Sequence, residues 1–505
     1  MQRTFLLVVL ISLFSLARAT NEAAAPIEVT LLHVNDVYQF MPVEGGKKGG
    51  LARLLTLKKQ ALKRTPHVVF TLGGDTLSPS AETRVYKGAH MIDAWNAVGL
   101  DYAVFGNHEF DLKKPDLLAR IEESRFTWLG ANIIDRETGT RFAGTPEFVV
   151  REFDGAKIGL IGLILPETRL TSAGADFVEI ADFCLTANLI VSRLRRVEKV
   201  DAVIGLTHLF MRQDKALAGC AEFDLILGGH EHTRLQASVD GTPIFKMAAD
   251  ARELGQFTLS FDPITKKLLS IDWTIIPVTD AIPDAPEFAP VVDKYRHLID
   301  ELDVRIGATA VTLDGLALSN RQRETNLGNF IADSYRAATD ADIGFLNGGS
   351  IRSDLTYYPG VLTRRDVLSI LPFNNPIMKI EVTGEVLLRA LEHGVARSAE
   401  DDQPGRFPQV SGMTFAFDAA APAGKRITAA TVGDATLDET RTYTLATSDF
   451  LVTRGGDGYT MFGQANVLID ADSAKRDAEI FEAAIQSAPG GVIAPKIEGR
   501  INRRD

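Results

Sequence analysis

The chain has 505 residues, of which 45% are hydrophobic and 24% are charged, and its formal net charge is -12. This length exceeds that of a typical single domain and predicts two or three domains. The composition is ordinary for a globular protein, and the acidic balance argues against non-specific binding to nucleic-acid polymers or anionic membranes. A small anionic substrate is still compatible, because a metal ion and nearby arginines reverse the charge locally.

The first residues have the pattern of a targeting signal. Arg3 precedes an apolar run from Phe5 to Leu16, and the small residues Ala17 and Ala19 follow. This order predicts a signal peptide over residues 1–19 and a secreted or periplasmic protein, with a buried N-terminal strand or helix as the alternative. The apolar run is too short to cross a bilayer as a mature helix. No cysteine directly follows it and no second long apolar run occurs, so we expect no stable membrane anchor.

Residues 27–277 alternate apolar runs of strand length with helical patterns. The expected strands are Ile27–Leu32, Val68–Leu72, Ala103–Phe105, Ala202–Leu206 and Leu225–Leu227. The expected helices are Leu51–Lys63, Ala89–Val98, Leu112–Glu123 and Asp182–Val197. This alternation predicts a largely parallel sheet with flanking helices. Residues 242–276 are expected to add strands that finish a second sheet.

A cluster of prolines divides the chain. Pro277, Pro283, Pro286 and Pro290 mark a linker, which we place at residues 278–305 with a helix at Val291–Val304. A second domain is expected over residues 306–501. Its expected helices are Leu327–Thr339, Gly384–Ala396 and Ser473–Ile485, and its expected strands are Ile343–Leu346, Met378–Val382 and Tyr443–Thr447. The two cysteines, Cys184 and Cys220, form either one disulfide or two separate buried thiols.

Polar side chains directly follow each expected strand of the first domain. They are Asp36, the turn Gly73-Gly74-Asp75, the run Gly106-Asn107-His108-Glu109-Phe110-Asp111, the pair Thr207-His208, and the run Gly228-Gly229-His230-Glu231-His232. Because ligands bind beyond the carboxyl ends of parallel strands, these side chains are expected to converge. Carboxylate, amide and imidazole groups suit Mg, Mn, Zn and Fe. Any one of these histidines alone would be an ordinary loop residue, but together they predict two divalent ions and phosphoryl or related ester hydrolysis.

These motifs, with Leu31-Leu32-His33-Val34-Asn35-Asp36 before them, resemble those of calcineurin-like metallophosphoesterases. Their order is similar to that of the 5'-nucleotidase/UDP-sugar hydrolase/2',3'-cyclic phosphodiesterase family, over about residues 27–500. The resemblance implies an α/β fold. A layered α/β/β/α metallophosphoesterase domain at residues 27–277 would be joined through the helical linker to a smaller α/β substrate-binding domain.

The resemblance also implies roles for individual residues. It implies two divalent ions, drawn from Zn, Mn, Co and Fe. Their ligands would be Asp36 and His232 for the first ion, Asn107, His208 and His230 for the second, and Asp75 for both. His108 would stabilise charge on the phosphoryl oxygens or protonate the leaving group, and Asp111 would orient its imidazole. Glu109 and Glu231 are expected to pack around the ligands or face solvent.

The first motif departs from the family pattern. The family usually has Asp-x-His there, with the histidine as a ligand of the first ion, whereas this chain has Asp36-Val37-Tyr38. Three alternatives follow: the first ion has one ligand fewer, Tyr38 favours iron there, or Tyr38 packs as a neutral aromatic side chain.

Four motifs of the second domain suit a nucleotide. They are Arg321–Gly328, Asn347–Arg352, Leu371–Asn375 and Gly455–Tyr459. Glycines allow close approach of the backbone, arginine binds phosphate oxygens bidentately, and Phe373 and Tyr459 could stack on a base. Taken singly, each arginine is more simply a surface ion pair and each aromatic a core residue. The resemblance implies that Arg321, Asn347 and Arg352 contact phosphate or ribose, that Phe373 and Tyr459 form a stacking pair, and that Asn375 contacts the base. The acid that often contacts ribose is absent from Thr460–Asn466.

The sequence therefore predicts an exported dinuclear-metal phosphohydrolase that converts nucleoside 5'-monophosphates to nucleoside and phosphate, with UDP-sugars and cyclic nucleotides as further candidate substrates. One alternative is a metal-dependent hydrolase of a non-nucleotide phosphate or sulfur ester. Another is a metal-impaired binding protein, which only Tyr38 supports. Because the two sites lie on different domains, we expect a hinge near the linker.

Overall fold

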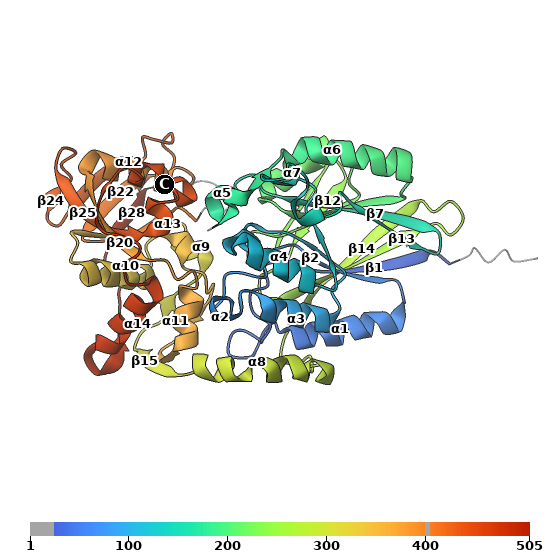
Figure 1. The fold of residues 1–505 in the computed structure, drawn as a ribbon, viewed down its shortest axis with the longest axis horizontal. Coiled ribbons are helices and arrows are strands. Elements are labelled where there is room, and N and C mark those ends of the chain that lie inside the picture. Colours follow the sequence, from blue (N-terminus) through green and yellow to red (C-terminus); the bar gives the residue numbers. More distant parts are fainter. Residues whose placement is uncertain (1–24, 173, 399–404, 505) are drawn as a thin grey trace, which may run out of the picture.

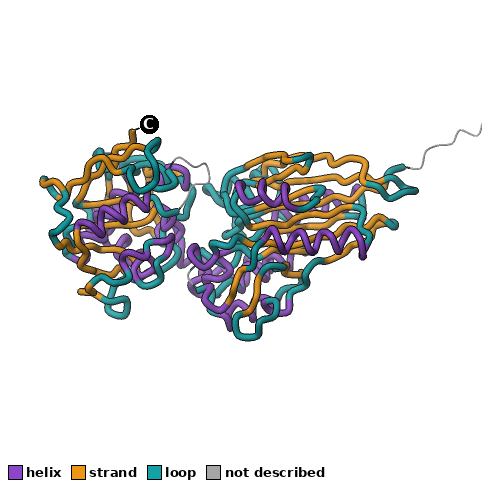
Figure 2. Tube along the Cα trace, turned by 90° about the horizontal axis from the view of Figure 1, so that it is seen from above, coloured by secondary structure: helices purple, strands orange, loops and turns teal. Residues whose placement is uncertain are grey.

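The computed structural model describes residues 25–172, 174–398 and 405–504. The expected signal peptide lies outside this described part. The described chain forms two lobes that meet at a narrow waist (Figures 1 and 2). The larger lobe contains the N-terminal half of the chain, and the smaller lobe contains the C-terminal part.

The larger lobe contains two six-stranded sheets. The first has the order β14 (Leu268–Pro277), β13 (Glu253–Phe261), β1 (Ile27–Val34), β2 (Val68–Leu72), β3 (Tyr102–Val104) and β4 (Thr127–Leu129). The second has the order β11 (Leu235–Val239), β12 (Thr242–Lys246), β10 (Leu225–Gly228), β9 (Ala202–His208), β7 (Ala156–Ile164) and β6 (Val149–Phe153). The pairs from β1 to β4 and from β12 to β7 are parallel, and the others are antiparallel. A small third sheet pairs β5 (Ile133–Asp135) with β8 (Val178–Ile180).

The expected parallel strands are confirmed, but they are divided between the two large sheets. The expectation that residues 242–276 finish one second sheet is wrong for most of that stretch. Only β12 joins the second sheet; β13 pairs antiparallel with the edge of β1 that β2 leaves open, and β14 pairs with β13. A hairpin of this length covers the edge of the first sheet, which would otherwise expose unpaired backbone groups.

Side chains of the sheets alternate between two cores, because successive residues of a strand point to opposite faces. In β1, Val29 and Leu31 lie in the core between the sheets, whereas Leu32 and Val34 lie in the core beneath the helices. Helices α1 (Leu51–Arg64) and α3 (Ala89–Val98) cover the first sheet, with α4 (Lys114–Glu123) beside α3. Helices α6 (Phe183–Arg193) and α7 (Met211–Cys220) cover the second sheet. The order of layers is therefore α/β/β/α, as expected.

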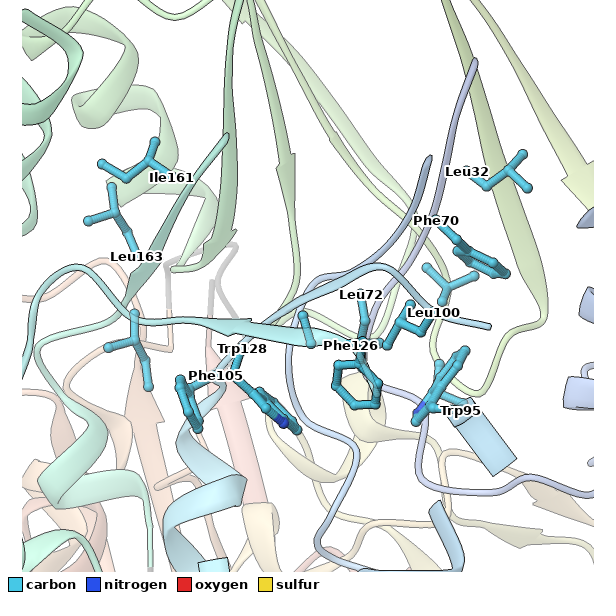
Figure 3. Close-up of a cluster of buried hydrophobic side chains, with 14 of the residues drawn as sticks. Leu32, Phe70, Leu72, Trp95, Leu100, Phe105, Phe126, Trp128, Ile161 and Leu163 are labelled. Carbon is cyan, nitrogen blue, oxygen red and sulfur yellow. The ribbon is translucent and has the colours of Figure 1, made fainter. Parts of the chain in front are cut away.

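Aromatic side chains fill the core between the first sheet and its helices (Figure 3). The ring of Trp95 on α3 meets Phe70 on β2 edge-on at 6.1 Å, and Phe105 stacks on Trp128 at 4.7 Å between ring centroids. On the other side of the lobe, a disulfide between Cys184 and Cys220 joins the start of α6 to the end of α7, with 5.9 Å between the Cα atoms. Of the two alternatives for the cysteines, the structure contains the disulfide.

The smaller lobe is built around a five-stranded sheet. Its order is β21 (Pro408–Ser411), β17 (Ile343–Asn347), β25 (Thr442–Ser448), β20 (Ile377–Thr383) and β26 (Asn466–Ile469). A second sheet has the order β24 (Ala435–Thr436), β23 (Ile427–Val432), β22 (Met413–Asp418) and β28 (Ile501–Arg504). Smaller sheets contain β19 (Gly360–Thr363), β15 (Arg305–Thr309) and β27 (Val492–Ile493), and β16 (Leu313–Asp314) with β18 (Thr356–Tyr357).

Helices of the smaller lobe pack on these sheets. The longer ones are α10 (Asn326–Thr339), α11 (Arg364–Ile370), α12 (Gly384–Val395) and α14 (Asp477–Ser487), and the short ones are α9 (Ala317–Asn320) and α13 (Asp449–Val452). Helix α10 begins at the expected place because the side chain of Thr325 accepts a hydrogen bond from the backbone N–H of Gly328, as an N-cap residue does.

Helix α8 (Ala289–Leu302) connects the lobes and runs beneath α1 and α3 in Figure 1. Its buried Tyr295 packs against Phe40 and Tyr86 of the larger lobe, at 6.0 and 4.8 Å between ring centroids. At the other end, Arg365 of α11 donates to the carbonyl of Ile299 and pairs with Asp303 at 2.7 Å. The connecting helix thus packs on the larger lobe along most of its length, and its C-terminal end contacts the smaller lobe through Arg365.

Candidate active site

Five loops meet at the carboxyl ends of β1, β2, β3, β9 and β10. The predicted metal ligands lie on these loops, at the ends of both large sheets. Three of them, Asp36, Asp75 and His230, have positive φ angles of 52°, 56° and 85°. Such angles are uncommon for residues other than glycine, and they concentrate at functional sites where the surrounding structure enforces them.

Four ligand atoms of the predicted second ion surround one point. Nε2 of His208 lies 3.2 Å from Oδ1 of Asn107, 3.2 Å from Oδ2 of Asp75 and 3.3 Å from Nδ1 of His230. Metal–ligand bonds of about 2.0–2.2 Å separate the ligand atoms of one ion by roughly 3 to 3.5 Å. The residues present therefore fit a divalent cation.

Surrounding groups hold these ligands in place. Nδ1 of His208 lies 2.7 Å from the carbonyl oxygen of Gly73, a contact of the kind that fixes the orientation of a metal-binding imidazole. The buried carboxylate of Glu109 accepts hydrogen bonds of 2.6–3.1 Å from four backbone N–H groups, those of Asp75, Thr76, Leu77 and Gly106. Glu109 thus anchors the loops that carry Asp75 and Asn107. Burial, followed by the nearby negative charge of Asp75, raises the pKa of Glu109 to about 7.

The electrostatics of the cluster favour a cation. Burial raises the pKa of Asp36 to about 6. Burial is the largest single effect and lowers the pKa of His208, but the charge and hydrogen bond of Asp75, the charge of Asp36 and the hydrogen bond to Gly73 together raise it to about 9. Imidazole and carboxylate ligands must be deprotonated to hold a divalent cation, so His208 would lose a proton when it held one.

The ligands of the predicted first ion form a second group beside the first. Oδ2 of Asp36 accepts from Nδ2 of Asn35 at 2.7 Å and from the backbone N–H of His230 at 2.9 Å. Oδ1 of Asp36 then faces Nε2 of His232, at 3.6 Å. Asp75 stands between the two groups, because its Oδ2 lies 3.2 Å from His208 Nε2 and 3.2 Å from the hydroxyl of Tyr38.

The hydroxyl of Tyr38 lies inside this first group. It is 3.1 Å from Nε2 of His232 and 3.4 Å from Oδ1 of Asp36. Burial, followed by the negative charge of Asp75, raises the pKa of Tyr38 well above its ordinary value. Nη2 of Arg352, from the smaller lobe, donates to the same hydroxyl at 2.9 Å.

His108 and Asp111 form the expected pair. They lie in a short 3₁₀ turn at Asn107–Asp111, which brings residues three apart to the same side. Nδ1 of His108 is 2.8 Å from Oδ2 of Asp111, and the same oxygen accepts from the hydroxyl of Ser78 at 2.9 Å. This contact leaves Nε2 of His108 for a ligand in the cavity that the residue lines.

One cavity of about 700 Å³, counting its part open to solvent, lies between the lobes. From the larger lobe it is lined by Asp75, Asn107, His108, Asp111, Thr171, Phe210, His230 and His232. From the smaller lobe it is lined by Arg321, Asn347, Gly349, Ser350, Arg352, Phe373, Asn375, Gly405, Phe450 and Asp457. The ring of Phe373 lies 5.5 Å from that of His108, centroid to centroid. Five of the six predicted substrate residues therefore face the predicted metal ligands across one space.

Tyr459 does not line this cavity. Its fully buried ring packs between Phe345 and Phe462, at 5.5 and 5.6 Å between centroids, and its hydroxyl donates to the carbonyl of Arg406. In this structure Tyr459 is a core residue and not the second ring of a stacking pair. In the core of the smaller lobe its ring is packed against Phe345, Phe462 and His393, which explains the difference.

Sequence reasoning missed several residues of the cavity wall, of which Asp457 and Phe450 matter most for a ligand. Asp457 lies two residues before Tyr459, and its Oδ2 accepts from Nδ2 of Asn347 at 2.6 Å. The flanking glycines of Gly456-Asp457-Gly458 were the available signal, but the acid was expected further along the chain. Phe450 on α13 also lines the cavity, and nothing in its sequence context separates it from a core phenylalanine.

A buried cation lies behind the metal ligands. Nζ of Lys246 contacts Oδ2 of Asp214 at 2.9 Å, and it also contacts Oε2 of Glu231 and the carbonyl of Leu209. Glu231 in turn accepts from the backbone N–H of Met211 at 2.6 Å. Because Glu231 stands between His230 and His232, this cluster ties the loop that carries both histidines to β12 and α7.

Comparison with known proteins identifies the family to which each lobe is similar. Residues 29–234 match the family model of calcineurin-like phosphoesterases, and residues 305–464 match that of the 5'-nucleotidase C-terminal domain. The chain belongs to the 5'-nucleotidase family of calcineurin-like phosphoesterases. As a member of this family it is a metal-dependent phosphoric ester hydrolase, and the predicted family and fold class are confirmed.

Named relatives of this 5'-nucleotidase family match nearly the whole chain. A 5'-nucleotidase of Bos taurus is 28% identical, covering 95% of this chain and 91% of the relative. A trifunctional nucleotide phosphoesterase of Bacillus subtilis is 29% identical over 94% of this chain, which spans only 35% of that longer protein. A solved 5'-nucleotidase precursor of Thermus thermophilus has a TM-score of 0.86 and 27% identity, covering 94% of this chain and 99% of that one. Within residues 25–172, 174–398 and 405–504, no helix has the length and apolar character needed to cross a membrane.

Proposed function

We propose that this family member is an exported hydrolase with two divalent ions that converts nucleoside 5'-monophosphates to nucleoside and phosphate. The observation that supports this most strongly is the shared cavity. Asp75, His230 and His232 line it from one lobe, and Arg352 and Phe373 line it from the other. A site for phosphoryl chemistry and a site for a planar base are thus within reach of one small molecule.

We assign the metal ligands as the sequence predicted them. Asp36 and His232 would hold the first ion, Asn107, His208 and His230 the second, and Asp75 both. Oxygen and imidazole donors of this kind fit Zn, Mn, Co or Fe. Two such ions, when bound, supply an activated water and offset charge on the phosphoryl oxygens.

The residues of the chain perform the remaining tasks. The imidazole of His108, oriented by Asp111, donates a hydrogen bond from Nε2 to a phosphoryl oxygen and passes a proton to the leaving oxygen. Arg321 and Arg352 bind phosphoryl oxygens with their guanidinium groups. These fixed charges are aimed at the place where negative charge develops, and such preorganisation is a large contribution to phosphoryl transfer.

The opposite end of the cavity suits a nucleoside. Phe373 and Phe450 offer apolar faces to a base, and Asn375 offers an amide to its edge. Asp457, held by Asn347, offers carboxylate oxygens to ribose hydroxyls. Asp457 thereby supplies the acid that the sequence lacks at Thr460–Asn466. UDP-sugars and cyclic nucleotides present the same phosphate and base, and they are further candidate substrates.

Export and domain organisation complete the proposal. The disulfide Cys184–Cys220 supports an oxidising compartment such as the periplasm, in agreement with the signal peptide expected at residues 1–19. We propose domain limits at 27–277 and 306–501, with the linker at 278–305. Because α8 is fixed to the larger lobe, we place the hinge at its C-terminal end. Neither a nucleic-acid polymer nor a membrane anchor is part of the proposal.

The decisive experiment measures phosphate release by the purified mature protein, stripped of metal and then supplied with Mn, Zn, Co or Fe in turn. AMP, an aryl phosphate, a UDP-sugar and a cyclic nucleotide are compared. Metal-dependent turnover of AMP well above that of the aryl phosphate supports the proposal. Turnover of the aryl phosphate alone, or of a sulfur ester, removes the nucleotide from it. No turnover with any metal favours a binding protein.

A further inference from the structure

Tyr38 contacts an arginine of the other lobe. Its hydroxyl accepts a hydrogen bond of 2.9 Å from Nη2 of Arg352. The guanidinium carbon of Arg352 lies 5.5 Å from the centroid of the Tyr38 ring and 5.8 Å from that of Phe373. Arg352 is thus held between one aromatic ring of the larger lobe and one of the smaller lobe, as cations are on the faces of aromatic rings.

Arg352 lies near the carboxylates of Asp75, Asp36 and Asp111 but forms no ion pair with them. Among the residues that the structure describes, no carboxylate lies within ion-pair distance of its guanidinium, and its buried Nε has no hydrogen-bond partner. The hydroxyl of Tyr38 and Nε2 of His232, at 2.9 and 3.3 Å from Nη2 of Arg352, orient the guanidinium. Because a buried cation is costly until it is paired, the side chain is prepared for an anion in the cavity that it lines.

A histidine at position 38 could not do the same. An imidazole that binds an ion through one nitrogen carries a proton on the other, so it presents no acceptor to an arginine. A phenol oxygen has lone pairs to accept with. The change from histidine to tyrosine in Asp36-Val37-Tyr38 therefore exchanges a metal ligand for a hydrogen-bond acceptor.

We propose that Tyr38 is a positioning residue of the phosphate subsite, whose hydroxyl holds the guanidinium of Arg352 toward the phosphoryl group. This inference rests on the proposed function, because it assumes that Arg352 binds the phosphate of the substrate. It differs from all three alternatives for Tyr38, since the hydroxyl acts on the second domain and not on the first ion.

The test compares Tyr38→Phe with the parent enzyme loaded with manganese. The variant keeps the ring and removes the acceptor. Ions per chain are counted by elemental analysis, and the Kd of inorganic phosphate is measured by calorimetry. The expected result is an unchanged ion count, a Kd weakened about 10-fold and a KM raised by a similar factor with kcat nearly unchanged, the usual loss for one hydrogen bond to a charged group. Loss of one ion per chain with an unchanged Kd would show that Tyr38 is a ligand and overturn the inference, as would no change in either quantity.

Two controls separate the positioning role from a structural one. Tyr102 also accepts from an arginine, Arg151 at 3.2 Å, but it does not line the cavity. Tyr102→Phe should therefore leave ion count and phosphate Kd unchanged. In an Arg352→Ala background, Tyr38→Phe should have no further effect on the Kd, because the group that it positions is gone. A full additional loss would contradict the inference.

These measurements also distinguish the inference from the proposed function. A parent enzyme that binds phosphate but does not hydrolyse AMP removes the nucleotide substrate and leaves the role of Tyr38 testable through the Kd. A parent enzyme that binds two ions but no phosphate overturns the inference itself.

Discussion

Nδ1 of His108 lies 2.8 Å from Oδ2 of Asp111, while its other ring nitrogen is left for the cavity. The imidazole is therefore oriented before substrate arrives. Replacing His108 by alanine should lower kcat by about 100-fold or more, because both a proton donor and a charge stabiliser are lost. Steady-state kinetics with AMP tests this, with the ion count as control. A kcat close to that of the parent would remove His108 from the catalytic pair.

Because Asp75 lies between the two groups of ligands, its replacement should remove more metal than the replacement of Asp36. Asp75→Asn should reduce occupancy of both ions, since one of its oxygens is close to the ligands of each. Asp36→Asn should reduce the occupancy of the first ion only, because Oδ1 of Asp36 faces His232 and not His208. Elemental analysis after gel filtration should give about zero and about one ion per chain, respectively. Equal losses would contradict the shared role of Asp75.

Lys246 predicts a large effect on stability from a residue outside the cavity. Lys246→Met would leave Asp214 and Glu231 buried without their cation, at a cost of about 3–5 kcal/mol in the free energy of unfolding. Denaturant titration measures this. The matched variant Lys246→Met/Asp214→Asn/Glu231→Gln has no buried charge left and should regain much of the loss. A single variant as stable as the parent would show that the cluster contributes little.

Removal of the disulfide should lower the stability of the protein without changing its catalytic activity. It joins residues 36 apart in the sequence, and neither cysteine lines the cavity. Replacing both cysteines by serine should lower the free energy of unfolding by about 2–4 kcal/mol and leave kcat and KM unchanged. Thermal unfolding with and without a reductant provides an independent check on the parent protein, and a Tm that does not respond to reduction would contradict the prediction.

The two aromatic residues predicted to stack on the base should now behave differently. Phe373→Leu should raise KM for AMP about 10-fold, because base stacking contributes about 1–3 kcal/mol, and it should change KM for an aryl phosphate much less. Tyr459→Phe should leave both KM values unchanged and cost about 1 kcal/mol of stability, because it removes only the hydrogen bond to the carbonyl of Arg406. A higher KM for AMP in Tyr459→Phe would restore its predicted role.

Much of the fold and site could be predicted from local patterns. Apolar runs such as Val68–Leu72 are strands because both faces are buried, and the polar residues that follow them converge because parallel strands share an edge. The partner of a strand is a different question. Nothing in Glu253–Phe261 indicates that it pairs with β1 and not with β12, since that choice depends on which sheet edge remains open.

The motif Gly455–Tyr459 shows why the direction of a side chain is harder to predict from the sequence than the type of residue. Asp457 and Tyr459 lie two residues apart, yet one lines the cavity and the other is in the core. The positive φ of Asp457, 52°, turns the chain between them, and the sequence shows only the glycines on either side. The sequence gives no sign of the ion pairs of Lys246, because Asp214 on α7 and Glu231 in the loop after β10 belong to other segments of the chain.

The walls of the cavity come from both lobes, so a ligand bound in it contacts two bodies at once. Under the proposed function, nucleoside and phosphate are expected to leave when the lobes separate at the proposed hinge. The rate of opening then sets an upper limit on turnover, and a more viscous solvent should slow the enzyme even though it leaves bond cleavage untouched.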